Sequence, residues 1–393
     1  MLTLLGQLHN IFRARKPTAF AIAASLVISN YQALAEVRIT DSADLAGRLV
    51  FTKISPNGQK DLMVANLDTG ETRELFASKS LEEYPSWSPD GKEVLFYSDI
   101  CGDREIFSIR SDGKDLKRLT KSKGVDEDPD WSPDGEKIVF KSSRGSKESS
   151  NIFVMNADGS RVIQLTDLRK DNAVPKWSPN GDEIVFASNK DWPGWDLLIH
   201  HLPTKTNFQL TTGTKNYSRA AWHPSGNTIA FSFGESTDVG IYAIRKGKGK
   251  AEKMTENAGR HFDPVFSDNG KVILFTKEVN PGKKNYQVFT KGNDTGSPKQ
   301  ITDGSSSVRN VSWTSLPDYP FSEEPTQAEE SSSEEASPTE LHEISFDERA
   351  DQACGRRLKK RPIKLQPAPE NSAQPTEKPR NIIRNLEDLE KEQ

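Results

Sequence analysis

The sequence has few cysteines, little apolar content and no surplus of basic residues, and each shortage excludes a class of protein. Only Cys101 and Cys354 are present among 393 residues, too few for a small scaffold held together by disulfides. The formal net charge is −4, whereas nucleic-acid-binding domains usually carry a strong basic surplus, so we expect no nucleic-acid partner. Apolar residues make up 34% of the chain, which indicates that part of it does not join a packed core.

Motifs of common catalytic and metal sites are also missing. The chain has no Gly-x-Ser-x-Gly, no His-Glu-x-x-His and no Cys-x-x-Cys, which argues against hydrolases and zinc sites of these types. His201, His223 and His261 fall at different places in the repeat described below, so we do not expect them to converge on a metal ion. We therefore expect no catalytic site, no metal and no other cofactor.

Residues 1–35 are typical of an export signal. Arg13, Arg15 and Lys16 precede an apolar stretch at residues 19–28, and small residues follow at 33–35. The apolar stretch is shorter than the roughly 20 residues of a membrane span, so we expect cleavage and no transmembrane segment afterwards; an uncleaved anchor is the alternative. The mature chain is then periplasmic or secreted. In that oxidising space Cys101 and Cys354 could pair, but the sequence does not decide whether they do.

One motif recurs along the middle of the chain. Its clearest copy, residues 128–135, reads Asp-Pro-Asp-Trp-Ser-Pro-Asp-Gly and precedes an apolar run at 138–140. Its aromatic anchor recurs at positions 87, 131, 177, 222, 266 and 313, so the copies are 44 to 47 residues apart. A repeat of this length predicts an array of similar units that bury their faces against each other. Ser-Pro-Asp-Gly is typical of a hairpin turn, and we interpret the tryptophan as a packing residue between units.

Each repeat contains short runs rich in β-branched and aromatic residues, separated by Gly, Pro, Asn and Asp. Such runs predict β-strands. Four strands in about 45 residues are typical of one blade of a β-propeller. We therefore predict an all-β fold, a six-bladed β-propeller of four-stranded antiparallel blades over residues 47–316, preceded by a linker at residues 36–46.

The strand count predicts how the ring closes. The second, third and fourth strands of a blade occur six times from Leu49 onward, whereas the first strand appears first at Trp87 and last at Trp313. The strand around Trp313 is therefore expected to pair with the strand at residues 49–51 and complete the first blade, which removes the open edges of the sheet. Residues 37–40 are also strand-like and could compete for this place.

The composition changes after the last repeat. Residues 317–393 are rich in Glu, Ser, Pro and basic side chains, and such a segment cannot bury enough apolar surface to offset chain entropy. We predict a disordered C-terminal tail, in which residues 381–391 could form a short helix.

The loops before each first strand are the candidates for function. They should lie on the face opposite to the Ser-Pro-Asp-Gly turns, with acidic residues in the early repeats and cationic ones in the late repeats, a polarised rim suited to a protein partner. Two tryptophans lie in another loop on that face, and tryptophan is a common interface anchor; the alternative is local packing or solvation. The predicted partner-binding residues are Glu83, Glu127, Asn172, Trp192, Trp195, Tyr217, Arg219, His261 and Arg309.

The repeat resembles those of the TolB family, the propeller component of the bacterial Tol-Pal envelope system. The resemblance rests on Pro-x-Trp-Ser-Pro-Asp-Gly and on the segments 138–144, 151–159 and 164–166, and it extends over residues 47–313. It implies a periplasmic, monomeric, six-bladed propeller that catalyses nothing and binds envelope proteins over its channel mouth, with a peptidoglycan-associated lipoprotein among the candidate partners. In that family an α/β domain precedes the propeller, and the linker 36–46 is too short to hold one.

Two alternative functions fit a propeller of this kind. A binder of carbohydrate or another envelope polymer would use Trp192 and Trp195. Similar propellers also occur in oligogalacturonate lyases, and that activity would require His201, His223 and His261 to meet at a metal ion.

Overall fold

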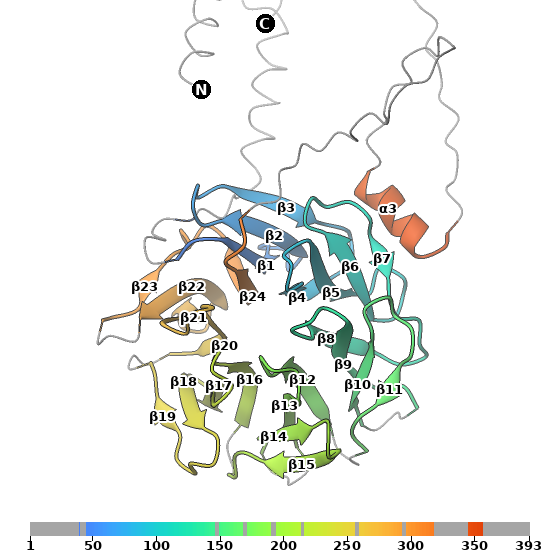
Figure 1. The fold of residues 1–393 in the computed structure, drawn as a ribbon. Helices are drawn as coiled ribbons and strands as arrows, with labels where there is room; N and C mark the ends of the chain where they lie inside the picture. The colour runs from blue at the N-terminus through green and yellow to red at the C-terminus, as the bar shows by residue number, and fades with distance from the viewer. Residues whose placement is uncertain are drawn as a thin grey trace, which may run out of the picture. The chain divides into compact units, whose positions relative to one another are not determined.

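The computed structural model describes residues 39, 45–145, 149–167, 171–189, 194–213, 216–255, 259–292, 296–317 and 345–356. Six four-stranded antiparallel sheets surround a central channel in this part of the chain (Figure 1). The predicted export signal, the predicted helix at 381–391 and Trp192 lie outside the described residues. Among the described residues, no helix has the length and hydropathy needed to cross a bilayer.

Five of the blades follow one another along the chain, each running from an innermost strand to an outermost strand. Blade 2 contains β4 (Glu82–Trp87), β5 (Glu93–Ser98), β6 (Glu105–Arg110) and β7 (Lys117–Arg118). Blade 3 contains β8 (Asp126–Trp131), β9 (Lys137–Ser142), β10 (Asn151–Asn156) and β11 (Ile163–Gln164). Blade 4 contains β12 (Asn172–Trp177), β13 (Glu183–Ser188), β14 (Asp196–His201) and β15 (Thr206–Gln209). Blade 5 contains β16 (Asn216–Trp222), β17 (Thr228–Glu235), β18 (Asp238–Arg245) and β19 (Glu252–Lys253). Blade 6 contains β20 (His261–Phe266), β21 (Val272–Asn280), β22 (Asn285–Gly292) and β23 (Lys299–Gln300).

Blade 1 joins the two ends of the propeller. Its strands, in spatial order, are β24 (Ser307–Thr314), β1 (Arg48–Ile54), β2 (Lys60–Asn66) and β3 (Thr72–Phe76). Leu49 of β1 pairs with Trp313 of β24, which confirms the predicted closure by the C-terminal strand. Ile39, the described residue of the competing segment, instead forms an isolated bridge with Thr302, which follows β23 of blade 6.

The apolar runs of the second strands are buried on both faces because each blade is packed between two others. In β5, Val94, Leu95 and Phe96 are all completely buried. Val94 and Phe96 belong to the apolar cluster shared with blade 1, while Leu95 belongs to the cluster shared with blade 3. This alternation follows from the two-residue period of a strand. Each large side chain buried in this way contributes roughly 1.5–3 kcal/mol.

The Ser-Pro-Asp-Gly segments form the hairpin turns predicted from the sequence. In the first copy, the Oγ of Ser88 donates a hydrogen bond to Asp90 Oδ1 at 2.7 Å and accepts one from the Glu93 N–H at 2.9 Å. Gly91 closes the turn at a φ of 69°, a conformation that glycine adopts without steric cost. The segment therefore serves the fold rather than a ligand.

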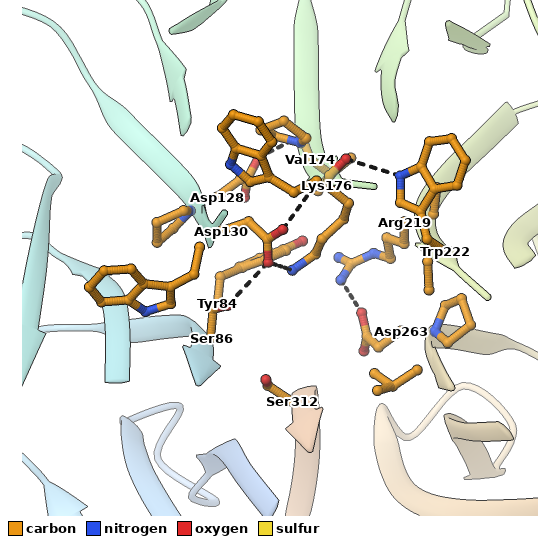
Figure 2. Close-up of a pocket in the computed structure, with 18 of the residues that line it drawn as sticks. Tyr84, Ser86, Asp128, Asp130, Val174, Lys176, Arg219, Trp222, Asp263 and Ser312 are labelled. Atoms are coloured by element: carbon orange, nitrogen blue, oxygen red, sulfur yellow. Dashed lines mark hydrogen bonds and ion pairs between the residues drawn. The ribbon is translucent and has the colours of Figure 1, made fainter. Parts of the chain in front are cut away.

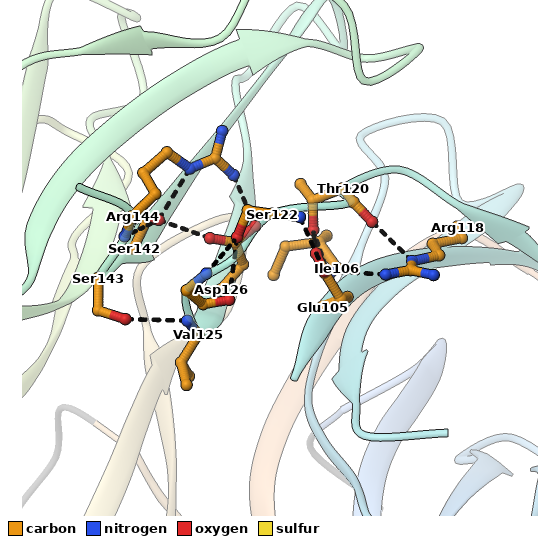
Figure 3. A network of polar contacts seen from close by, with 11 residues as sticks. Glu105, Ile106, Arg118, Thr120, Ser122, Val125, Asp126, Ser142, Ser143 and Arg144 are labelled. Carbon is orange, nitrogen blue, oxygen red and sulfur yellow. Dashed lines mark hydrogen bonds and ion pairs between the residues drawn. The ribbon is translucent and has the colours of Figure 1, made fainter. Parts of the chain in front are cut away.

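A threonine after each outermost strand of blades 2 to 6 ties that strand to the third strand. In blade 2, the Ile106 N–H donates to Thr120 Oγ1 at 2.9 Å, and the same hydroxyl donates to the buried Glu105 carboxylate, which Arg118 also binds (Figure 3). The equivalent hydroxyls accept a third-strand N–H in the other four blades, from Thr166, Thr211, Thr255 and Thr302. The threonine recurs near the end of these repeats because its hydroxyl gives a buried N–H of the third strand a hydrogen-bond acceptor.

One helix packs against the outside of the ring, in a segment that the sequence assigned to a disordered tail. Helix α3 (Phe346–Ala353) begins at Ser345, whose side chain forms a capping box with Glu348. The ring of Phe346 meets Phe76 of β3 edge-on at 5.7 Å, and Ala350 is buried. A sequence that looks disordered by composition is therefore ordered locally by a few apolar contacts and a good cap.

A disulfide between Cys101 and Cys354 fixes the end of α3 to blade 2, so the pairing that the sequence left open is present. The two residues are 253 positions apart. Arg356 supports the junction by donating to the Ile100 carbonyl at 3.0 Å. Disulfides of this kind are typical of proteins that fold in an oxidising compartment.

Replacing Thr166 with valine should lower the free energy of unfolding by roughly 1–3 kcal/mol. The isosteric side chain removes the acceptor of the Ile152 N–H, a bond buried inside blade 3. Urea denaturation measures the effect. The control Thr206→Val, at an exposed position of β15, should stay within about 0.5 kcal/mol of the parent protein, and equal stability of both variants would contradict the role assigned to the buried hydroxyl.

The double variant Cys101→Ala/Cys354→Ala should unfold more easily than the parent protein, by roughly 2–4 kcal/mol. The disulfide closes a long loop and so lowers the conformational entropy of the unfolded chain. Its loss also removes the covalent link between α3 and blade 2. Thermal unfolding with and without a reductant is the measurement. The reductant should destabilise the parent protein and leave the variant unchanged; a variant as stable as the oxidised parent would refute a structural role for the bond.

Candidate functional site

The innermost strands of the six blades line the central channel, and each is interrupted by a bulge. At the bulge one residue adopts a left-handed conformation with φ between 47° and 55°. Five of these strands also shift register there against the second strand, and β24 does so against β1. The six bulge residues are Tyr84, Asp128, Val174, Arg219, Asp263 and Asn310. Together they form a ring around the channel. Because their residue types differ, the repeat pattern of the sequence does not reveal this ring.

Side chains of one blade bond the backbone of the next at this ring. Asp128 accepts the Val174 N–H at 3.1 Å, and Asp263 accepts the Asn310 N–H at the same distance. Two residues further along β8, Asp130 accepts the Trp177 N–H at 3.0 Å (Figure 2). Carboxylates near the axis thus join neighbouring blades and satisfy backbone groups at the bulges.

Arg219 crosses the channel at the level of the ring. It forms an ion pair with Asp263 of blade 6, and its guanidinium carbon lies 5.1 Å from the ring centre of Tyr84 in blade 2 (Figure 2). Burial alone would raise the pKa of Asp263, but Arg219 and Arg309 hold it well below its usual value. Burial raises the pKa of Asp128, which has a weaker cationic environment. The charged cluster closes the channel part of the way along.

A cavity of about 300 Å³ occupies the channel between this ring and the Ser-Pro-Asp-Gly turns. Its polar lining includes Asp130, whose Oδ1 accepts from Ser86 Oγ at 3.1 Å and from Lys176 Nζ at 2.7 Å. Its aromatic lining consists of Tyr84 of the ring and of Trp87, Trp131, Trp177, Trp222 and Phe266. The recurrent tryptophans therefore pack between blades, as predicted, and also form the wall of a cavity that the sequence analysis did not identify.

Three predicted binding residues lie at the opposite end, which we call the loop-side mouth. Glu83, Glu127 and Arg309 each immediately precede a bulge residue. Glu83 is bound by Lys60 at 3.0 Å and Glu127 by Lys141 at 2.7 Å. Burial would raise the pKa of Glu127, yet Lys141 and Arg104 lower it. The acidic part of the rim is thus neutralised by its own neighbours.

The other predicted residues are more deeply buried. Asn172 and His261 are almost fully covered by protein, and His261 Nδ1 bonds Thr255 Oγ1 at 2.8 Å. Burial, with a smaller contribution from Lys277, lowers the pKa of His261 to about 4, so its ring is neutral at physiological pH. Tyr217 stacks on Phe233 at 4.4 Å, and Trp195 packs against the apolar cluster of blades 4 and 5. Arg219 alone of this set lines the cavity.

The comparisons with known proteins agree with this geometry. The six four-stranded sheets around the axial channel define the fold as a six-bladed β-propeller. Residues 46–220 match the PD40 family, described as the TolB beta propeller domain. This stretch, fewer than half of the residues of the chain, is therefore similar in sequence to TolB-like PD40 propeller repeats.

Solved structures show the same architecture at low sequence identity. TolB from Acinetobacter baumannii has 20% identity and a TM-score of 0.61 over 76% of this chain and 74% of that one. A putative TolB from Agrobacterium tumefaciens has 18% identity and a TM-score of 0.53 over 70% of this chain and 100% of that one. Hydrazine synthase from Kuenenia stuttgartiensis has 14% identity and a TM-score of 0.57 over 71% and 47%. At these identities the likeness shows the fold alone.

Beside the rim, Glu82 is fully buried without a cationic partner. Its Oε1 accepts from Ser78 Oγ at 2.6 Å, whereas no described residue bonds its Oε2. Burial raises the pKa of Glu82 to about 8, and the nearby Asp61 adds to the effect. The equivalent residue of β8, Asp126, instead has Arg144 at 2.6 Å. Glu82 is therefore protonated at neutral pH.

Stability should fall as the pH rises from about 5 to 8, because the folded pKa of Glu82 lies above its unfolded value. The protonated carboxyl of Glu82 contributes its full share of the folding free energy below the unfolded pKa. Between the unfolded and the folded pKa, this share falls by up to about 1.4 kcal/mol per pH unit, because the unfolded chain releases the proton. The variant Glu82→Gln keeps the shape and cannot ionise, so this slope should be smaller. Urea denaturation at a series of pH values measures it, and parallel profiles for the two proteins would show that Glu82 is not responsible.

Proposed function

We propose that this protein is a non-catalytic, exported scaffold that binds another protein of the cell envelope over its central channel. The observation that carries the proposal is the axial cavity with its aromatic wall (Figure 2). Its volume accommodates one or two side chains rather than a folded domain. A partner would therefore insert a short segment while the rest of it rests on the surrounding turns.

The indole side chains support this interpretation because tryptophan is enriched among the residues that contribute most to the binding energy of protein interfaces. Asp130 and Lys176 add a charged pair to the same wall, which gives orientation to a polar segment. At the loop-side mouth, Glu83, Glu127 and Arg309 belong to the proposed contact surface as its polar border. The resemblance to TolB makes a peptidoglycan-associated lipoprotein the first partner to test.

An extracytoplasmic location is part of the proposal. The disulfide between Cys101 and Cys354 supports it, since such bonds persist in oxidising compartments and are rare in the cytosol. The sequence of residues 1–35 points to the same compartment.

The absence of catalysis is likewise proposed, and the histidines support it. His201 bonds Thr204, His223 bonds Ser225 and His261 bonds Thr255, each within its own local structure. The described part of the chain holds no group of three side chains able to bind a metal ion. A lyase that depends on a metal held by these three residues is not favoured by this placement.

An affinity capture from a native envelope extract tests the proposal, with the full-length protein as bait. The variant Ala221→Phe adds bulk to the cavity at a residue that forms part of its lining, and it should reduce capture of the specific partner about tenfold or more, as expected for loss of a central anchor site. Quantitative mass spectrometry of the captured proteins gives the measurement.

Two further baits make the result specific. Val162→Phe also introduces a phenyl ring, at an exposed position next to the outermost strand of blade 3 and outside the cavity lining, and should capture normally. The double variant Glu83→Gln/Glu127→Gln tests the loop-side mouth. Undiminished capture by Ala221→Phe would remove the cavity from the binding surface, and undiminished capture by both channel variants would refute binding over the channel.

A further inference from the structure

Three arginines surround one phenylalanine at the loop-side mouth. The guanidinium carbons of Arg309, Arg260 and Arg219 lie 4.7, 5.1 and 5.7 Å from the ring centre of Phe262. They come from blade 1, from the start of blade 6 and from blade 5. We call Phe262 and these arginines the Phe262 cluster. Cation–π contacts hold each guanidinium face, which leaves the N–H edges for other partners.

Few of those N–H groups are used within the described structure. Arg219 donates one hydrogen bond and Arg309 donates one, both to Asp263. Arg260 forms no ion pair with any residue of the described ranges, and its Nε is buried without a partner. A buried, unpaired guanidinium nitrogen is costly, so its persistence in the fold needs an explanation.

The backbone of Arg260 is held firmly while its side chain lacks a partner. Its carbonyl accepts the Glu278 N–H at 2.9 Å, and the residue also forms a parallel bridge with Val239. Two strands therefore fix the position from which the guanidinium reaches Phe262. A backbone that is already fixed favours anion binding, because less conformational entropy is lost when the ligand binds.

The charges around the cluster do not balance. The three arginines outnumber the carboxylates beside them, which are Asp263 and, next to Arg219, Asp128. The His261 ring next to Phe262 is neutral, and Lys277 on the neighbouring strand adds to the positive potential. On the other side of the mouth, Glu83 and Glu127 are already bound by lysines. The mouth is therefore attractive to an anion on the side of blades 5, 6 and 1.

We propose that the Phe262 cluster is a binding site for carboxylate groups, with Arg260 as its main anchor and Arg219 and Arg309 as supporting donors. Asp263 shows the mode of binding, because each of its two oxygens takes one arginine of the same cluster. A second planar carboxylate matches the remaining forked N–H edges. The excess of arginines over carboxylates fits an acidic ligand, such as a segment with closely spaced acidic residues.

This inference goes beyond the proposed function and does not depend on it. The site can be tested on the isolated protein with small probes, whereas the proposed function is tested by capture of a partner through the cavity on the other side of Arg219. Either result can fail without deciding the other.

The test is a titration of the full-length protein, followed through the side-chain Nε–Hε signals of arginine in NMR spectra. The probes are the peptide acetyl-Glu-Gly-Glu-amide, its neutral counterpart acetyl-Gln-Gly-Gln-amide, glutarate and inorganic phosphate. We expect saturable shifts of the Arg260, Arg219 and Arg309 signals with the acidic peptide and with glutarate, weakened by added salt. Tighter binding of the peptide than of glutarate identifies acidic side chains of a protein as the source, and the reverse identifies a free diacid.

Matched variants decide the role of Arg260. Arg260→Gln should weaken binding of the acidic probes about tenfold or more, followed on the Arg219 and Arg309 signals, since a charge-assisted hydrogen bond is lost. Arg260→Lys should fall between, because lysine keeps the charge and loses the fork. Arg161→Gln, at an exposed site of blade 3, should bind as the parent protein does, and thermal unfolding confirms that each variant is folded.

Three outcomes would overturn the proposal. The first is no saturable shift with either acidic probe. The second is unchanged affinity of the folded Arg260→Gln variant for the acidic probes, which would show that they bind at another site. The third is tighter binding of phosphate than of both carboxylate probes, which would assign the site to another class of ligand.

Discussion

The bulge in each innermost strand is the constraint on which the channel depends. It interrupts the ladder and places one residue per blade in a left-handed conformation, which costs roughly 1–2 kcal/mol for a residue other than glycine. Bonds between blades offset this cost, as where Asp128 receives the Val174 N–H and Asp263 receives the Asn310 N–H. The same geometry turns the side chain of Arg219 toward Tyr84 on the opposite side of the ring. The same bulges therefore hold neighbouring blades together and place Arg219 across the channel.

The closed channel separates two environments with different chemistry. The turn side has an aromatic wall with one ion pair between Asp130 and Lys176, whereas the loop side has arginines gathered on Phe262. Arg219 contributes to both, since it lines the cavity and belongs to the cluster. The ion pair between Arg219 and Asp263 therefore lies at the boundary between the two sides.

The sequence predicts most of the fold and little of the site, for a physical reason. The repeat anchored at Trp131 and the late appearance of a strand at Trp313 were enough for six blades and their closure, because short-range patterns determine strands and turns. The ring of bulges was not visible, since Tyr84, Val174 and Arg219 share a backbone conformation and no chemistry. The pairing of positions 253 apart and the docking of α3 depend on tertiary contacts that no local pattern encodes.

The disulfide has a topological consequence. Every residue from Cys101 to Cys354 lies in one covalent loop, while the strands β1 to β5 lie outside it. Two sheets therefore join a strand of the loop to a strand outside it: β24 pairs with β1 in blade 1, and β6 pairs with β5 in blade 2. A single peptide-bond cleavage anywhere inside the loop leaves both fragments covalently joined. A propeller of this design can be cut once within the loop by a protease and still keep all of its blades on one molecule.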